Sequence, residues 1–102
     1  MPVLAVTKEN IQAEVIDAPQ TVLLDFWAPW CAPCRMLSPV IDQIAEEVPQ
    51  LKVVKINIDQ EPELAAGFSI MSIPTLVVVK GGREVNRAVG VQPKAAILAM
   101  VR

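Results

Sequence analysis

The sequence predicts an α/β fold in which a central mixed sheet of about five strands is flanked by about four helices. One reason is composition: 53% of the residues are hydrophobic and only 4% are aromatic, so the core must consist mostly of Val, Ile, Leu and Ala. Such a core is typical of a buried sheet covered by helices. The second reason is that strand-like and helix-like segments alternate along the chain, and two consecutive strands follow near its end.

The first part of the chain predicts a strand, a helix and a second strand. Residues 3–6 form a short apolar strand, and Thr7 can cap a helix over residues 8–17. Residues 18–20 contain a proline that breaks this helix. Residues 21–27 are nearly all apolar, as in a central strand covered on both faces. One face of the predicted helix is apolar and consists of Ile11, Val15 and Ile16.

The middle of the chain predicts a long helix and a third strand. The helix runs from residue 32 to about residue 48, and Pro39 in its interior should kink it. Residues 51–58 form the strand. The side chains expected to face inward from the helix are Met36, Leu37, Val40, Ile41, Ile44 and Ala45.

Two shorter helices are expected in the second half. Asp59 can cap the first, with Pro62 in its first turn and its end near Gly67. Pro93 opens the second, which continues through Val101. The side chains available for packing from this last helix are Ala96, Ile97, Met100 and Val101.

A β-hairpin is predicted between these two helices. Its strands are residues 75–79 and 83–89, and Gly81 and Gly82 make the turn. Parallel β-α-β units in the first half and this antiparallel hairpin in the second give a mixed sheet with helices on both faces.

Length and charge limit the class of protein. With 102 residues, the chain is predicted to be a single domain over residues 1–102. The net charge of −2 gives no electrostatic reason to expect a nucleic acid or an anionic membrane as partner. No apolar stretch approaches the roughly 18 residues of a membrane span, and the first residues lack the pattern of a signal peptide. We therefore expect a cytoplasmic protein in a reducing compartment.

Cys31 and Cys34 are the only cysteines in the sequence, and they lie where the long helix begins. In the first turn of a helix, residues i and i+3 share a face at a distance that permits a disulfide. The helix N-terminus also favours a thiolate at the first cysteine, because unpaired N–H groups and the helix dipole stabilise negative charge there. Cys31 is therefore the predicted nucleophile, and Cys34 is the predicted resolving thiol.

Other uses of two cysteines fit the sequence less well. A structural disulfide across so short a loop contributes only about 2 kcal/mol in the chain-entropy model. A zinc site needs four ligands, whereas the sequence has two cysteines and no histidine. The missing histidine also excludes a Cys–His nucleophilic dyad. The pattern favours thiol–disulfide exchange with no metal or cofactor, because the redox-active disulfide lies within the chain.

Four motifs extend the pattern beyond the cysteines: DFWAPWCAPCR at residues 25–35, KINID at 55–59, SIPT at 72–75 and VGV at 89–91. With them the chain resembles the thioredoxin family over its full length. The resemblance implies the thioredoxin fold and a cis peptide bond before Pro74, so that the backbone edge of Ile73 could pair with a substrate segment. The alternative is a trans proline that starts an edge strand. The apolar docking surface implied for partner proteins is Trp30, Ala32, Pro33, Ile73, Pro74, Val89, Gly90 and Val91.

Asp25 interrupts an apolar run that otherwise belongs in the core. Burial should raise the pKa of its carboxyl group, so that it can accept and return the proton of Cys34 through water. In the implied fold, Lys55 lies on the adjacent strand and modulates Asp25. The alternative for both residues is a solvated position.

The sequence departs from the family pattern at Ala32, where glycine is more usual, and alanine should stiffen the start of the helix. Arg35 is basic, as is common in the family, and either tunes the thiols or is a solvated surface charge.

The resemblance implies a monomeric protein disulfide reductase with a role in electron transport and cell redox homeostasis. Its expected partners are proteins that contain disulfides and a thioredoxin reductase, dependent either on NADPH or on ferredoxin. One alternative is a thiol oxidase or isomerase of the same fold, although such relatives usually carry histidine in the motif and an export signal. A non-enzymatic binding subunit of the same fold is the other alternative.

Overall fold

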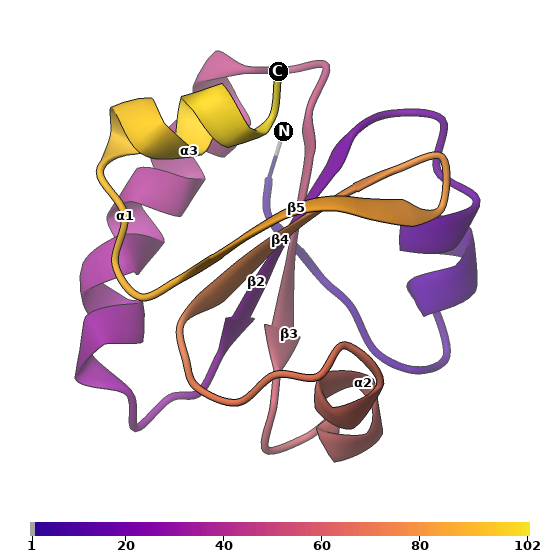
Figure 1. Ribbon diagram of the computed structural model, residues 1–102, viewed down its shortest axis with the longest axis vertical. Helices are drawn as coiled ribbons and strands as arrows, with labels where there is room; N and C mark the ends of the chain where they lie inside the picture. The colour runs from indigo at the N-terminus through magenta and orange to yellow at the C-terminus, as the bar shows by residue number, and fades with distance from the viewer. Residues whose placement is uncertain (1) are drawn as a thin grey trace.

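The computed structural model describes residues 2–102, and its elements follow the predicted order (Figure 1). The strands are β1 (Leu4–Ala5), β2 (Val22–Trp27), β3 (Lys52–Asn57), β4 (Thr75–Lys80) and β5 (Arg83–Val89). The helices are α1 (Ala32–Glu47), α2 (Pro62–Gly67) and α3 (Lys94–Met100), and a π-helical turn, η1 (Gln12–Ile16), precedes β2.

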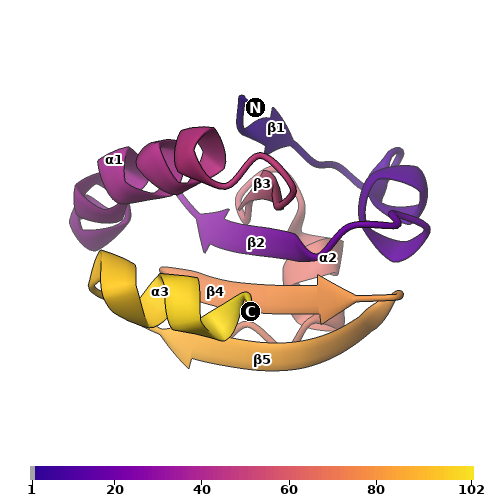
Figure 2. The same ribbon diagram turned by 90° about the horizontal axis from the view of Figure 1, so that it is seen from above.

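The five strands form one mixed sheet in the order β1-β3-β2-β4-β5 (Figure 2). β3 runs parallel to both β1 and β2, whereas β4 is antiparallel to β2 and to β5. Helices α1 and α3 lie on one side of the sheet, and α2 and η1 lie on the other (Figure 1). The predicted mixed sheet with helices on both faces is confirmed.

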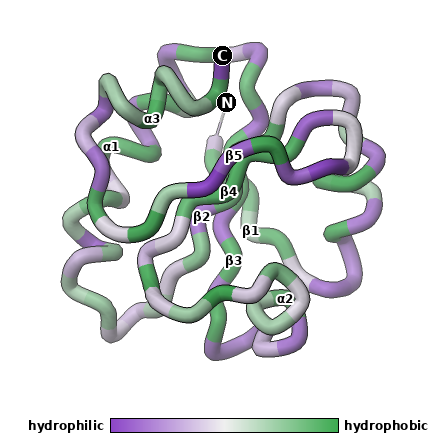
Figure 3. Tube along the Cα trace, in the orientation of Figure 1, coloured by the Kyte–Doolittle hydropathy of each residue, from purple (hydrophilic) through white to green (hydrophobic). Residues whose placement is uncertain are grey.

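The sheet separates two apolar cores because successive side chains of a strand point to opposite faces. On the side of α1 and α3, Leu23 and Leu76 pack with Leu37 and Ile97. On the other side, strand residues such as Phe26 pack against the segment around α2. Figure 3 shows apolar residues along the central strands, whereas polar residues occur in the outer loops and also along α1 and β5.

The first helix is shorter than predicted. In place of a helix over residues 8–17, the chain makes turns and then η1. The Asn10 side chain accepts a hydrogen bond from the Thr7 amide at 2.7 Å, and the Thr7 hydroxyl accepts one from the Glu9 amide at 3.3 Å. These local bonds give the backbone an alternative to a regular helix.

The predicted capping role of Asp59 is wrong. Glu61 is the N-cap residue of α2, and within residues 2–102 no side-chain hydrogen bond caps this helix. The Asn57 side chain instead accepts hydrogen bonds from the amides of Asp59 and Gln60, at 2.9 and 3.3 Å. Because of this turn, α2 begins only at Pro62, and the Asp59 carboxylate binds the Trp30 side chain instead.

Met36 is a third correction, because this residue is 70% exposed and does not face inward. The buried face of α1 follows a helical stripe through Leu37, Ile41 and Ile44, and Met36 lies off this stripe. Val40 is only half-buried, and Pro39 lies inside the helix as predicted.

Candidate active site

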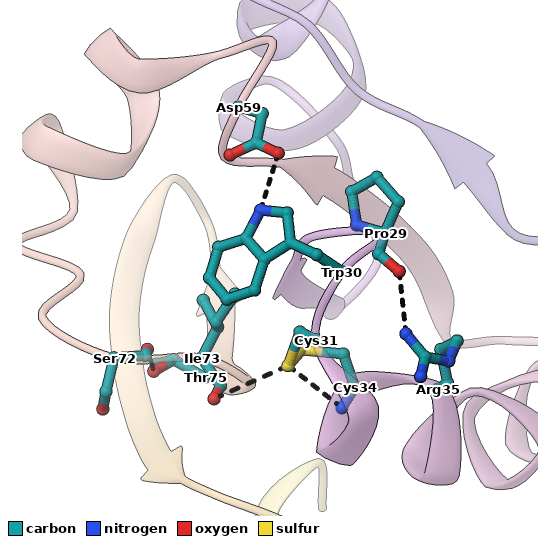
Figure 4. The surroundings of a disulfide bond; sticks show 9 residues. All are labelled: Pro29, Trp30, Cys31, Cys34, Arg35, Asp59, Ser72, Ile73 and Thr75. Carbon is teal, nitrogen blue, oxygen red and sulfur yellow. Dashed lines mark hydrogen bonds between the residues drawn. A yellow bond between two sulfur atoms is a disulfide. The ribbon is translucent and has the colours of Figure 1, made fainter.

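The two cysteines lie at the N-terminus of α1 and form a disulfide, with their Cα atoms 5.3 Å apart (Figure 4). Cys31 is the N-cap residue, and its sulfur accepts a hydrogen bond from the Cys34 amide at 3.2 Å. The Cys31 sulfur therefore lies at the N-terminal end of α1, where an N–H group of the first turn and the helix dipole favour negative charge. The predicted pairing of the two cysteines is confirmed.

The loop between β2 and α1 is fixed by hydrogen bonds around the cysteines. The Cys31 amide donates to the Ala28 carbonyl at 3.1 Å. The Arg35 guanidinium donates to the Pro29 carbonyl at 2.9 Å, and thus ties the helix to the loop that precedes it (Figure 4). Arg35 is exposed, and this contact gives it a structural role that the sequence did not reveal.

Both sulfur-bearing residues are nearly buried, with 5% of Cys31 and 3% of Cys34 exposed. They pack with Ala28 in a small apolar cluster, and Trp27, Ile58 and Ile73 lie against it. Such surroundings leave little of either cysteine exposed to solvent.

The segment before β4 lies against the disulfide. The bond between Ile73 and Pro74 is cis, as the resemblance implied. The Ile73 carbonyl oxygen is 3.9 Å from the Cys31 sulfur (Figure 4). The Thr75 hydroxyl donates to the Ser72 carbonyl at 2.7 Å, and the Gly90 amide donates to the Pro74 carbonyl at 2.8 Å. Two loops that are distant in sequence therefore meet beside Cys31.

Apolar side chains are exposed around this junction. Trp30 is 66% exposed, Val89 56% and Val91 46%. Of the other residues expected in the docking surface, Ala32 and Pro33 are exposed, Ile73 and Gly90 are half-buried, and Pro74 is buried. Pro74 therefore supports the surface from beneath and adds little exposed area to it.

The orientation of Trp30 is fixed by Asp59, whose carboxylate accepts a hydrogen bond from the indole nitrogen at 2.9 Å (Figure 4). The sequence offered one signal for this pair, because both residues fall within motifs of the family pattern. The position of Asp59 before Pro62 predicts a helix cap instead.

Asp25 is buried in the centre of the sheet, with 1% of the residue exposed. Its partners in register are Lys55 on β3 and Leu76 on β4. Neither carboxylate oxygen has a hydrogen-bond partner among the described residues. Burial raises the pKa of Asp25 to about 6, the positive charge of Lys55 opposes this rise, and the negative charge of Asp42 adds to it.

Lys55 lies beside Asp25 but bonds to a different side chain. Its ammonium nitrogen donates to the Ser38 hydroxyl at 3.1 Å and is 4.8 Å from the centre of the Trp27 ring. Neither Ser38 nor Asp42 is among the site residues that the sequence predicts. Both follow Cys34 at intervals of one helical turn, and this spacing was the available signal.

The described residues contain neither a candidate metal site nor a helix that could span a membrane. Within residues 2–102, no group of three or more Cys, Asp or Glu side chains could hold a metal ion. None of the helices in the same range is long and apolar enough to cross a membrane.

Comparison with known proteins shows similarity along the whole described chain. The family model described as thioredoxin matches residues 2–102. A thioredoxin of Pyropia yezoensis is 51% identical over 98 residues, which are 95% of this chain and 92% of the relative. Thioredoxin 1 of a Nostoc species is 48% identical over 93 residues, or 90% of this chain and 87% of the relative. A thioredoxin of Streptomyces clavuligerus is 48% identical over 93 residues, which are 91% of this chain and 87% of the relative.

Proposed function

Because the chain belongs to the thioredoxin family, we propose that it works as a disulfide reductase in which Cys31, Cys34 and Asp25 have separate roles. The family assignment makes the protein an oxidoreductase that acts on protein disulfides by thiol–disulfide exchange. The single observation that carries the proposal is the Cys31–Cys34 disulfide at the N-terminus of α1, beside the Ile73 backbone.

In the proposed reaction, the thiolate of Cys31 attacks one sulfur of a substrate disulfide. A bond forms between Cys31 and this sulfur, the substrate disulfide breaks, and the other substrate sulfur leaves as a thiolate. Cys34 then loses its proton and attacks the Cys31 sulfur. This step forms the Cys31–Cys34 disulfide and releases the second substrate thiolate, so the substrate gains two electrons and the protein is oxidised.

We assign to Asp25 the uptake of the Cys34 proton before the second attack. Asp25 lies on β2 on the sheet face that packs against α1, because Leu23, two residues earlier, packs against Leu37 of that helix. A carboxyl group with a pKa of about 6 is a suitable proton acceptor near neutral pH. A water molecule would connect the two groups.

The exposed apolar residues around Cys31 are proposed to bind the substrate protein. Trp30, Val89 and Val91 offer apolar area, and the Ile73 backbone offers hydrogen bonds to an extended segment. Lys55 is proposed to modulate Asp25 by its charge.

Members of this family act with a thioredoxin reductase and with disulfide-containing substrates. For this chain we propose a monomer of the cytoplasm, without a bound cofactor, that a reductase dependent on NADPH or on ferredoxin returns to the dithiol form. Supplying each reductase system in turn, and following the free thiols of Cys31 and Cys34, identifies the electron donor.

The reaction is tested by the reduction of insulin disulfides with dithiothreitol. The native chain should accelerate this reduction, and Cys31→Ser should abolish the acceleration. Cys31→Ala serves as a second variant, because it also removes the thiol and should behave in the same way. Full acceleration by both variants would refute the assignment of Cys31 as the nucleophile.

A further inference from the structure

The Lys55 side chain is held between two groups that belong to different elements. Its ammonium nitrogen donates to the Ser38 hydroxyl of α1 at 3.1 Å, and it lies 4.8 Å from the ring centre of Trp27 on β2. Lys55 and Ser38 are both half-buried. A hydrogen bond and a cation–π contact together restrict a long side chain that would otherwise extend into water.

This position places the Lys55 charge near Asp25 without a direct bond. The two residues are partners in register on β2 and β3, so their side chains leave the same face of the sheet. Among residues 2–102, neither oxygen of Asp25 has a hydrogen-bond partner. Lys55 therefore acts on Asp25 through its charge, and the strength of that action depends on where the ammonium group is held.

The charged groups that act on Asp25 come from two elements. β3 contributes Lys55, which favours the ionised carboxylate, and α1 contributes Asp42, which disfavours it. The thiol of Cys34 on α1 is a further titratable group in the reduced protein. The neighbour on β4, Leu76, is apolar. Lys55 is thus the stabilising charge in this set, and Ser38 is its hydrogen-bond partner on α1.

We propose that Ser38 is a positioning residue for the exchange reaction: its hydroxyl holds the Lys55 ammonium beside Asp25, and this sets the pH range in which Asp25 takes up the proton of Cys34. The inference rests on the proton-transfer role proposed for Asp25. Without the hydroxyl, the ammonium group loses a half-buried partner and turns toward water. Its attraction for the Asp25 carboxylate then weakens, because charge interactions fall with distance and with rising dielectric constant.

The first measurement is a ¹³C NMR titration of the Asp25 carboxyl group in the oxidised protein. The disulfide form is chosen because its cysteines do not titrate. Ser38→Ala should raise the titration midpoint of Asp25 by roughly half a pH unit or more. Ser38→Thr retains a hydroxyl group and should restore the native midpoint. Alanine favours helices, so Ser38→Ala is expected to fold.

A double-variant cycle separates positioning from a general effect of the substitution. Lys55→Gln should raise the midpoint at least as much as Ser38→Ala, because it removes the positive charge itself. In the Lys55→Gln background, Ser38→Ala should cause no additional rise. An unchanged midpoint in Ser38→Ala, or an equal shift with and without Lys55, would overturn the proposal.

Kinetic measurements then test the proton-transfer role of Asp25 separately from the positioning role of Ser38. The rate of resolution of a preformed mixed disulfide on Cys31 is measured against pH. Its midpoint should follow the titration of Asp25 in the native chain and in Ser38→Ala, and should disappear in Asp25→Asn. If the rate profile of Asp25→Asn equals that of the native chain, the proton-transfer role fails. The NMR cycle still decides whether Ser38 positions Lys55.

Discussion

Asp25 and Lys55 face each other in register on β2 and β3, yet the Lys55 ammonium donates its hydrogen bond to Ser38, and neither oxygen of Asp25 has a partner in the part of the chain that the structure describes. A buried carboxylate without hydrogen bonds is costly to ionise. The positive charge of Lys55 reduces this cost but does not remove it. The pKa of Asp25 still rises from 3.8 to about 6. At neutral pH, Asp25 thus stabilises the folded state less than an apolar residue would. Its raised pKa makes it better suited to exchange protons.

The first prediction concerns stability in Asp25→Asn. The folded-state pKa of Asp25 is raised, so its contribution to stability is greatest at low pH and is lost as the pH rises from about 4 to about 6. A shift of this size corresponds to about 3 kcal/mol at neutral pH. Asn carries no charge, so Asp25→Asn should be more stable than the native chain at pH 8, and its advantage should nearly vanish at pH 4.

Urea unfolding of the oxidised proteins at both pH values measures this difference. Glu46→Gln is the control, because it removes an exposed carboxylate of α1 and should change the free energy of unfolding by less than about 0.5 kcal/mol. An Asp25→Asn protein that is less stable than the native chain at pH 8 would show that Asp25 is an ordinary structural carboxylate.

The second prediction is that the two thiols differ in reactivity. Cys31 caps α1 and its sulfur accepts a hydrogen bond from the Cys34 amide, whereas Cys34 lies within the first turn of the helix. In the reduced protein, Cys31 should therefore react with iodoacetamide at least about tenfold faster than Cys34 near neutral pH. Mass spectrometry of peptides after brief labelling gives the ratio.

Trapping provides an independent check of this assignment. Cys34→Ser lacks the resolving thiol and should accumulate mixed disulfides with substrate proteins on Cys31. Cys31→Ser should not accumulate them. The reverse result would exchange the roles of the two cysteines.

The third prediction concerns the turn between β4 and β5, where Gly81 and Gly82 have φ values of +56° and +77°. A side chain at either position is strained, and Ala at position 81 should cost about 1 kcal/mol. At Gly82, a Cβ atom would also lie 3.0 Å from the Ile16 carbonyl oxygen. Gly82→Ala should therefore lower the free energy of unfolding more than Gly81→Ala does, as measured with urea. Equal losses would show that the contact with Ile16 relaxes freely.

Several features of the fold could be predicted because they depend on local patterns. The apolar run of β2, the paired glycines of the hairpin and the spacing of Cys31 and Cys34 each specify a structure within a few residues. The prediction of a regular helix over residues 8–17 is wrong. The hydrogen bond between Thr7 and Asn10 competes with helix formation, and the chain forms turns and η1 there.

The site residues that lie in sequence motifs could be predicted. The hydrogen bonds that depend on tertiary packing could not. Asp25 stood out as a charge in an apolar run, and the structure places it beside Lys55. The bond between Ser38 and Lys55 joins residues that are 17 positions apart, and the bond between Trp30 and Asp59 joins residues 29 apart. Neither bond follows from periodicity or propensity. The Ser38–Lys55 bond depends on how α1 packs against β3, and the Trp30–Asp59 bond depends on how the loop before α1 meets the loop after β3.

The last prediction tests whether the exposed apolar residues near Cys31 bind substrate. Val89 and Val85 lie on the same strand and are similarly exposed, at 56% and 53%. Val89 pairs with Thr75, next to the cis bond at the active site, whereas Val85 lies toward the hairpin end of β5. The two valines thus offer the same chemistry at different distances from Cys31. Val89→Gln should raise the KM for a protein disulfide such as insulin by about three- to tenfold, because part of the buried apolar area is lost.

Val85→Gln should leave this KM unchanged and serves as the matched control. The kcat of both variants should stay near the native value, since neither residue touches the reacting sulfur atoms. A small disulfide such as dithiobis(nitrobenzoate) reaches Cys31 without covering β5, so both variants should reduce it at the native rate. If Val89→Gln slows the small and the protein disulfide equally, the substitution has disturbed the disulfide itself. If Val85→Gln raises the KM as much as Val89→Gln does, substrate binding is not confined to the surface around Cys31.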